Sequence, residues 1–150
     1  MKSDFIQYVA ALVALVLAGA CEELLPKPFG VGFPVLLACV QFGACRRPAA
    51  VALAFALAAG AFEDALSSLP AMASVGYFAA VTALARWARL PVGCSALTYP
   101  GYQLWLWVWT GGAFAEAWMR ALVALPLGLV TAFAAWPFLR LLERKAALDE

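Results

Sequence analysis

The sequence predicts an all-α integral membrane protein, a single bundle of about six short transmembrane helices that occupies residues 1–150. Hydrophobic residues make up 66% of the 150 positions and charged residues 13%, against about 45–50% and about 25% in soluble domains. A domain of this size has too much surface to hide such an excess in one core. The apolar residues also gather into six segments separated by polar ones, so lipid is the expected surroundings of the outer surface.

The expected spans cover about residues 5–21, 31–45, 49–62, 71–86, 94–111 and 117–139. Several are shorter than the ~20 helical residues that cross ~30 Å of hydrocarbon. The second and third could instead form one bent helix, but Arg46-Arg47-Pro48 would then lie at the bilayer centre, where two arginines are very unfavourable. We therefore expect a tight hairpin that brings both arginines to the membrane surface.

Each segment ends at charged or turn-forming residues. In chain order these are Glu22-Glu23, Arg46-Arg47-Pro48, Glu63-Asp64, Arg86 with Arg89, Gly111-Gly112, and Arg140 followed by Glu143, Arg144 and Lys145. The first segment, with Lys2 before it and Ala18-Gly19-Ala20-Cys21 at its end, also resembles a cleaved secretory signal. Cleavage would leave five spans, so we favour a retained first helix.

The basic residues predict the orientation of the bundle. With six spans, eight basic residues fall on one side and two, Lys27 and Arg120, on the other. The eight are Lys2, Arg46, Arg47, Arg86, Arg89, Arg140, Arg144 and Lys145. Because the side rich in lysine and arginine faces the cytoplasm, both termini are expected to be cytoplasmic.

The residue content offers little to catalysis or to metal binding. The chain has no histidine, and its four cysteines show no two-residue gap of the kind that zinc and redox sites use. The net charge of +1 gives no field that would attract nucleic acid. We expect no catalytic, metal or cofactor-binding residues, and a protein that is not an enzyme.

Small residues spaced by four mark candidate helix-packing faces. Ala52, Ala56 and Gly60 lie in the third segment, and Ala10, Ala14 and Ala18 lie in the first. Such stripes let helix backbones approach closely in lipid. The third helix has little bulk on any face, so we expect it at the centre of the bundle. Either stripe could alternatively bind another subunit.

The third segment and its flanks resemble the bacterial rod-shape-determining protein MreD family. The resemblance lies in a basic-proline turn at Arg46-Arg47-Pro48, a small-residue helix, Gly60 four before Asp64, and a short loop with Pro70. A small-residue helix with an aromatic follows at Ala73–Phe78. The match covers about residues 30–90. One departure is Ala71-Met72 after the proline, where the family often has Leu-Gly.

This resemblance implies an inner-membrane component of the cell-elongation machinery that works beside MreC, MreB and the enzymes of peptidoglycan synthesis. The candidate partner contacts are the charged turns at Glu63-Asp64 and Arg46-Arg47, and a solvated helix end is the alternative interpretation of Glu63-Asp64. The family also resembles, in fold, the substrate-binding subunits of energy-coupling-factor vitamin transporters. Such a subunit is the alternative function, because Ala10, Ala14 and Ala18 fit the spacing with which those subunits dock a partner.

Overall fold

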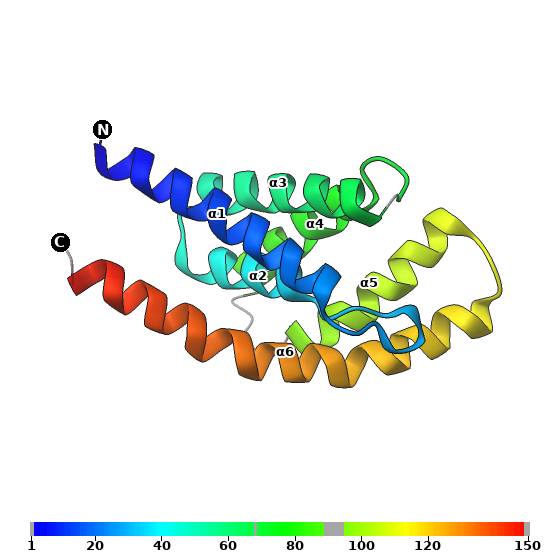
Figure 1. Cartoon of the computed structure of the whole chain (residues 1–150). Helices are drawn as coiled ribbons and strands as arrows, with labels where there is room; N and C mark the ends of the chain where they lie inside the picture. Colours follow the sequence, from blue (N-terminus) through cyan, green and yellow to red (C-terminus); the bar gives the residue numbers. More distant parts are fainter. Residues whose placement is uncertain (1, 68, 89–94, 149–150) are drawn as a thin grey trace.

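The computed structural model describes residues 2–67, 69–88 and 95–148, which form helices and no strand (Figure 1). The α-helices are α1 (Lys2–Leu24), α2 (Val35–Arg46), α3 (Ala49–Ser67), α4 (Ala73–Trp87), α5 (Ser95–Thr110) and α6 (Phe114–Leu148), with a short 3-10 helix η1 (Pro28–Gly30) after α1. One α-helix corresponds to each of the six apolar segments. The all-α part of the predicted fold class is confirmed.

The hairpin between α2 and α3 turns at Arg47 and Pro48. A residue that precedes proline disfavours helical backbone angles, and Arg47 accordingly has φ −103° and ψ 159°. The helix therefore stops there, and a new helix begins directly after the proline. Arg46 and Arg47 are both exposed at this turn, so the arginines lie at the end of the bundle.

The turn between α5 and α6 depends on two glycines. Gly111 and Gly112 have φ angles of 70° and 106°, and the backbone of a residue with a Cβ atom rarely adopts such angles. The chain reverses there, and α6 then runs for 35 residues through Pro126 and Pro137. The helix continues past residue 139, where the expected sixth span ends. A charged residue such as Arg140 does not by itself terminate a helix.

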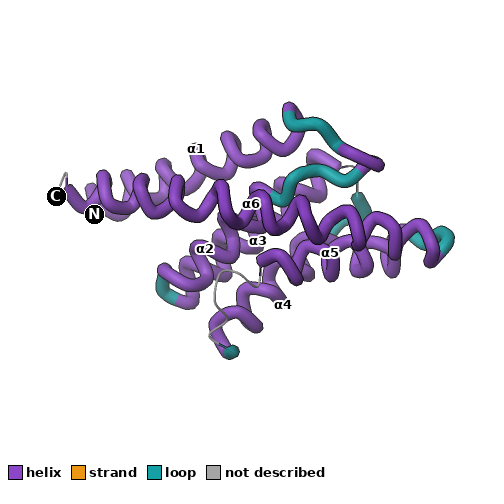
Figure 2. The backbone as a smooth tube through the Cα atoms, turned by 90° about the horizontal axis from the view of Figure 1, so that it is seen from below, coloured by secondary structure: helices purple, strands orange, loops and turns teal. Residues whose placement is uncertain are grey.

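The centre of the bundle is α2, which contacts every other α-helix (Figures 1 and 2). Its Leu36 and Val40 have no exposed surface. The helices α3 and α4 form one packed pair, and α5 and α6 form another. The expectation that the third helix lies centrally is wrong: α3 has an exposed face that includes Leu53 and Leu57. The bulkier side chains of α2 fill the core better than alanine does.

The small residues of α3 lie on its buried face. Ala52 and Ala56 have at most 1% of their surface exposed. A Cβ atom added to Gly60 would lie 2.5 Å from the Cα of Val75, so only glycine permits the contact between α3 and α4. The third helix therefore packs against α4 by backbone-to-backbone approach.

The first helix packs through the end of its small-residue stripe. Ala18 is buried and Ala14 is half-buried, while the side chain of Ala10 lies outside those that the structure describes. A Cβ atom added to Gly19 would lie 2.3 Å from Cε1 of Phe62. The first helix thus contacts α3 of the same chain at Gly19, next to the buried Ala18.

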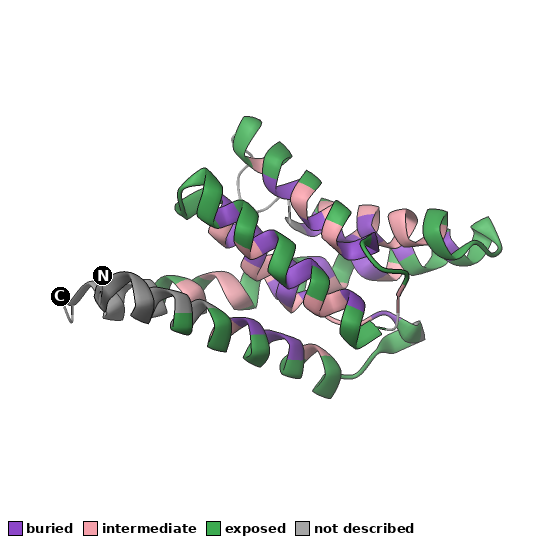
Figure 3. Ribbon diagram, turned by 90° about the horizontal axis from the view of Figure 1, so that it is seen from above, coloured by how far each residue is buried: buried purple, intermediate pink, exposed green. Residues whose placement is uncertain are grey.

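The outer surface is largely apolar, and buried residues follow the inward face of the helices (Figure 3). Leu12 and Leu17 on α1 and Phe133 on α6 each have more than half of their surface exposed. By length and hydropathy, two helical stretches among the described residues qualify as candidate membrane spans. They are Ala49–Ser67 and Phe114–Leu141.

Candidate functional site

The four candidate contact residues lie at opposite ends of α3. Arg46 and Arg47 precede its first turn, and Glu63 and Asp64 belong to its last turns. Sixteen helical residues rise ~24 Å, so the two pairs do not form one site. We refer to the neighbourhood of Glu63 and Asp64 as the acidic end and to that of Arg46 and Arg47 as the basic end.

Asp64 joins α3 to the beginning of α4. Its side chain is 8% exposed, and Oδ1 accepts a hydrogen bond of 2.8 Å from the backbone N–H of Ser74. The first N–H groups of a helix have no partner within it, and a carboxylate satisfies one while it interacts favourably with the helix dipole. Asp64 is therefore an internal cap of α4.

Ser74 extends this contact to α5. Its hydroxyl group lies 2.5 Å from that of Tyr102, and both residues are buried. Nearby, the indole N–H of Trp105 donates to the backbone carbonyl of Ala73 at 2.8 Å. A polar network thus connects three helices at the acidic end: α3 through Asp64, α4 and α5.

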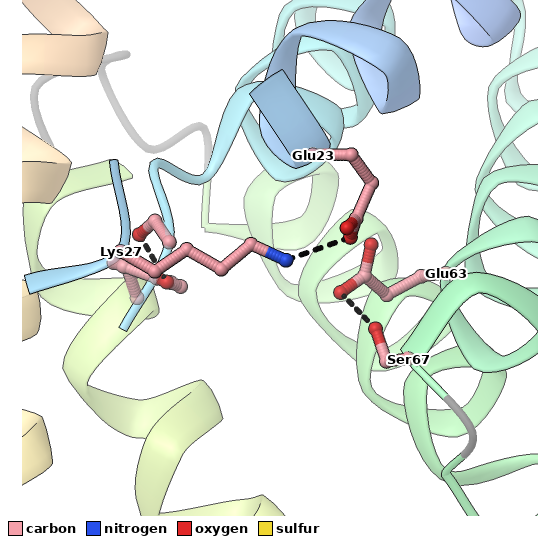
Figure 4. Close-up of polar contacts among 6 residues, drawn as sticks. Glu23, Lys27, Glu63 and Ser67 are labelled. Carbon is pink, nitrogen blue, oxygen red and sulfur yellow. Dashed lines mark hydrogen bonds and ion pairs between the residues drawn. The ribbon is translucent and has the colours of Figure 1, made fainter. Parts of the chain in front are cut away.

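Glu63 lies beside α1 and the loop that follows it (Figure 4). Its Oε1 accepts a hydrogen bond of 3.0 Å from the hydroxyl of Ser67. Close by, Lys27 pairs with Glu23 at 2.8 Å. Glu63 is half-buried, so it is the more accessible of the two acidic candidates.

Glu22 ends α1 and faces the first turn of α2. Burial raises the pKa of this carboxyl group to about 9, and the neighbouring Glu63 adds to the rise. The backbone N–H groups of Leu36 and Val35 oppose the shift, because they stabilise the charged form. Glu22 therefore keeps its proton at neutral pH.

Residues that sequence reasoning missed add further polar contacts inside the bundle. Tyr99 donates a hydrogen bond of 2.6 Å to the carbonyl of Gly32. Gln41 donates to the hydroxyl of Thr98, and its Oε1 is buried without a donor, as is Oδ2 of Asp64. The signal that could have found part of this set is Tyr99 with Tyr102, three apart on one helix face.

The basic end is built on aromatic rings. Trp136 of α6 packs edge-on against Phe42 of α2, with ring centroids 4.9 Å apart. The guanidinium carbon of Arg46 lies 5.9 Å from the centroid of Trp136, and that of Arg140 lies 5.0 Å from it. Sequence reasoning placed Arg46 and Arg140 on one side of the membrane but did not bring them together.

Arg86 of α4 adds a fourth guanidinium group at this end. It donates hydrogen bonds of 3.0 Å to the carbonyl of Ala44 and 2.7 Å to that of Arg47. These carbonyls belong to the C-terminal end of α2, where cations are favoured. Arg86 therefore ties α4 to the turn that carries Arg46 and Arg47.

Within the described residues no three acidic or cysteine side chains are arranged to hold a metal ion. The acidic end offers hydrogen-bond acceptors and hydroxyl groups, and the basic end offers exposed guanidinium groups. Comparison with protein-family models, with curated proteins and with solved structures finds no match to this chain.

Proposed function

We propose that this chain is a non-enzymatic, multi-pass component of the bacterial inner membrane that works in the cell-elongation complex. In that role it supports cell shape and peptidoglycan synthesis beside an MreC-like protein and MreB. The observation that carries the proposal is the shared role of two motif residues. Gly60 permits the close approach of α3 to Val75, and Asp64, one turn later, caps α4 at Ser74.

That shared role gives a physical reason for the spacing of Gly60 and Asp64, on which the resemblance to the MreD family partly rests. A glycine four residues before an aspartate lies on the same helix face, and here both meet the beginning of the next helix. A side chain at position 60 would push α3 away from α4, and loss of the carboxylate at position 64 would remove the cap of α4. The motif is thus the kind of pattern that a family with this helix pair would keep.

Membrane placement is supported by the apolar surface and by the separation of charge. Phe133, Leu12 and other large apolar side chains face outward, where water would be unfavourable and lipid is not. In the proposed orientation the basic end and both termini face the cytoplasm. Reporter fusions after Lys145 and near Arg46 should give a cytoplasmic signal, and one after Asp64 an external signal. A cytoplasmic signal at Asp64 would overturn the six-span arrangement.

The function is tested by depletion in rod-shaped cells that carry this chain. Loss should produce round cells, and a tagged copy should co-purify with an MreC-like protein. Glu63→Gln and Arg47→Gln test the partner contacts, because neither side chain caps a helix. Each should weaken capture by up to about fivefold, the effect of losing a partly solvated charge pair, while Arg120→Gln serves as the control. Normal cell shape after depletion would contradict the proposal.

The alternative is the substrate-binding subunit of an energy-coupling-factor vitamin transporter. Its specific support is the set of buried side-chain oxygens without a hydrogen-bond partner, which includes Oδ2 of Asp64 and Oε2 of Glu22, since a bound ligand could donate to such atoms. Against it, Ala18 is buried within its own chain, and this removes part of the stripe that would dock a coupling subunit. A stoichiometric vitamin in the purified protein, with cell shape unaffected by depletion, would favour this alternative.

A further inference from the structure

Two arginines from distant parts of the chain meet at one tryptophan. The guanidinium carbon of Arg46 lies 5.9 Å from the ring centroid of Trp136 and 5.8 Å from that of Phe42. The guanidinium carbon of Arg140 lies 5.0 Å from the same tryptophan centroid. We call Phe42, Arg46, Trp136 and Arg140 the arginine platform. Cation–π contacts hold both charged groups near the rings, so less side-chain freedom remains to be lost on binding an anion.

Among the side chains that the structure describes, those around the platform are strongly basic. Arg86 and Arg47 lie at the same end of α2, so four guanidinium groups gather around the contact between α2, α4 and α6. The acidic side chains that the structure describes are distant from it, near the other ends of α1, α3 and α6. They are Glu22, Glu23, Glu63, Asp64 and Glu116. Like charges gathered in this way attract an anion, and the planar guanidinium fork matches the geometry of phosphate.

An apolar strip leads away from the platform along α6. Phe133 lies three residues before Trp136 and has 79% of its surface exposed, and Leu129, one further turn away, is also exposed. Residues at these spacings share one helix face. An anion that carries a hydrocarbon chain can therefore place its phosphate on the arginines and its chain along Phe133 and Leu129.

We propose that the arginine platform binds the headgroup of an anionic phospholipid such as phosphatidylglycerol. The inference rests on the membrane placement given under the proposed function, in which this end faces the cytoplasmic leaflet, where anionic headgroups attract basic side chains. It does not depend on a role in cell elongation. The phosphate interacts with Arg46 and Arg140, and Arg86 and Arg47 add to the local field.

Diffuse attraction between a basic surface and an anionic leaflet is the competing explanation. Under diffuse attraction every arginine at this end contributes alike, and an uncharged residue contributes nothing. If the platform binds the headgroup, Arg46 and Arg140 contribute more to lipid binding than Arg47 does. Trp136 then contributes as well, although it has no charge. The two explanations therefore differ in the expected effect of Trp136→Leu.

The experiment is native mass spectrometry of the detergent-purified chain, titrated with phosphatidylglycerol or with phosphatidylcholine. The wild type should bind one phosphatidylglycerol with clear preference over phosphatidylcholine. Arg46→Gln and Arg140→Gln should each weaken this binding by about fivefold, the effect expected for one basic residue near an anionic headgroup. Arg47→Gln should have a smaller effect, and Arg120→Gln, at the far end of α6, should have none.

Two further sets of variants separate the platform from charge alone. Arg46→Lys and Arg140→Lys keep the charge but lose planar stacking, and Trp136→Leu removes the ring. Each should weaken binding by about two- to fivefold. If Trp136→Leu does not fold, the lysine variants alone decide the question.

Three results would overturn the proposal. One is equal binding of phosphatidylcholine, and another is lysine variants that bind like the wild type. The third is displacement of bound phosphatidylglycerol by millimolar inorganic phosphate as effectively as by added phosphatidylglycerol. The site would then recognise a free anion and not a lipid. Normal cell shape after depletion, with lipid binding intact, would reject only the cell-elongation role. Round cells after depletion, with no preference for phosphatidylglycerol, would reject only the lipid site.

Discussion

The two ends of the bundle use their charged residues in opposite ways. At the acidic end Asp64 is almost entirely buried and bonded to the first turn of α4, and Glu22 faces the first turn of α2. At the basic end Arg46 and Arg140 are exposed and rest on an aromatic ring. The acidic residues thus hold helices together, whereas these two arginines keep their charge at the surface.

The length of the side chains accounts for this difference. A carboxylate on a short stem cannot reach water from inside a helix pair, so it needs an internal donor, and a helix N-terminus supplies one. An arginine packs its stem and guanidinium plane against apolar groups while its N–H donors reach the surface. The following predictions test this contrast between an end with internal charges and an end with exposed charges.

The largest effect is expected at Gly60. A Cβ atom there would lie 2.5 Å from Val75 Cα and 2.7 Å from Val75 N, so Gly60→Leu must force α3 away from α4. We expect a loss of about 3 kcal/mol or more in the free energy of unfolding, or failure to accumulate. Gly43→Ala is the matched control, because its new Cβ would meet only Phe55, at 3.9 Å. Thermal unfolding in detergent measures both, and a stable Gly60→Leu protein would contradict the close contact.

An intermediate effect should separate the two ends directly. Asp64→Ala removes the cap of α4 and should lower the free energy of unfolding by about 1–2 kcal/mol. Arg47→Gln, at the exposed turn, should stay within about 0.5 kcal/mol of the wild type. Urea or thermal unfolding of both variants provides the comparison. Equal losses at the two positions would remove the distinction between an end with internal charges and an end with exposed charges.

A smaller effect on stability is expected from a change of pH, because Glu22 titrates differently in the folded and unfolded chains. Its pKa is raised to about 9 in the folded chain from an ordinary 4.5, so folding takes up a proton between these values. The contribution of protonated Glu22 to the free energy of unfolding is therefore fully present below pH 4.5 and is lost as the pH rises toward 9. Glu63, Glu23, Lys27 and Asp64 face the same region. The melting temperature of the wild type should fall over this range more steeply than that of Glu22→Gln. Parallel curves for the two proteins would refute the assignment to Glu22.

The positions of the helices could be predicted from the sequence because polar and proline residues interrupt the apolar segments. The turn at Arg46-Arg47-Pro48 was predicted for that reason. The central place of α2 could not be predicted, since a pattern along one helix does not say which neighbours cover it. The length of α6 could not be predicted, because Arg140 shows where apolar character stops and helical structure continues beyond it.

The candidate site was predictable as a set of charged helix ends and not as a set of contacts. Whether Asp64 faces outward or caps a helix depends on where Ser74 lies, ten residues further along the chain. The meeting of Arg46 with Trp136 joins residues ninety positions apart, and nothing in the local sequence of either predicts it. Long-range packing therefore decided which charges are internal and which are exposed.

The shortness of the central helix has a consequence for the path of an electric field through the protein. Twelve residues of α2 rise ~18 Å, well below the ~30 Å of a typical hydrocarbon layer. In the proposed membrane placement the longer helices around α2, such as α3 and α6, meet the lipid, so the two ends of α2 lie below the membrane surfaces inside the bundle. Glu22 and Arg86 provide polar groups at those ends, and a transmembrane voltage would fall mainly across the short apolar stretch between them.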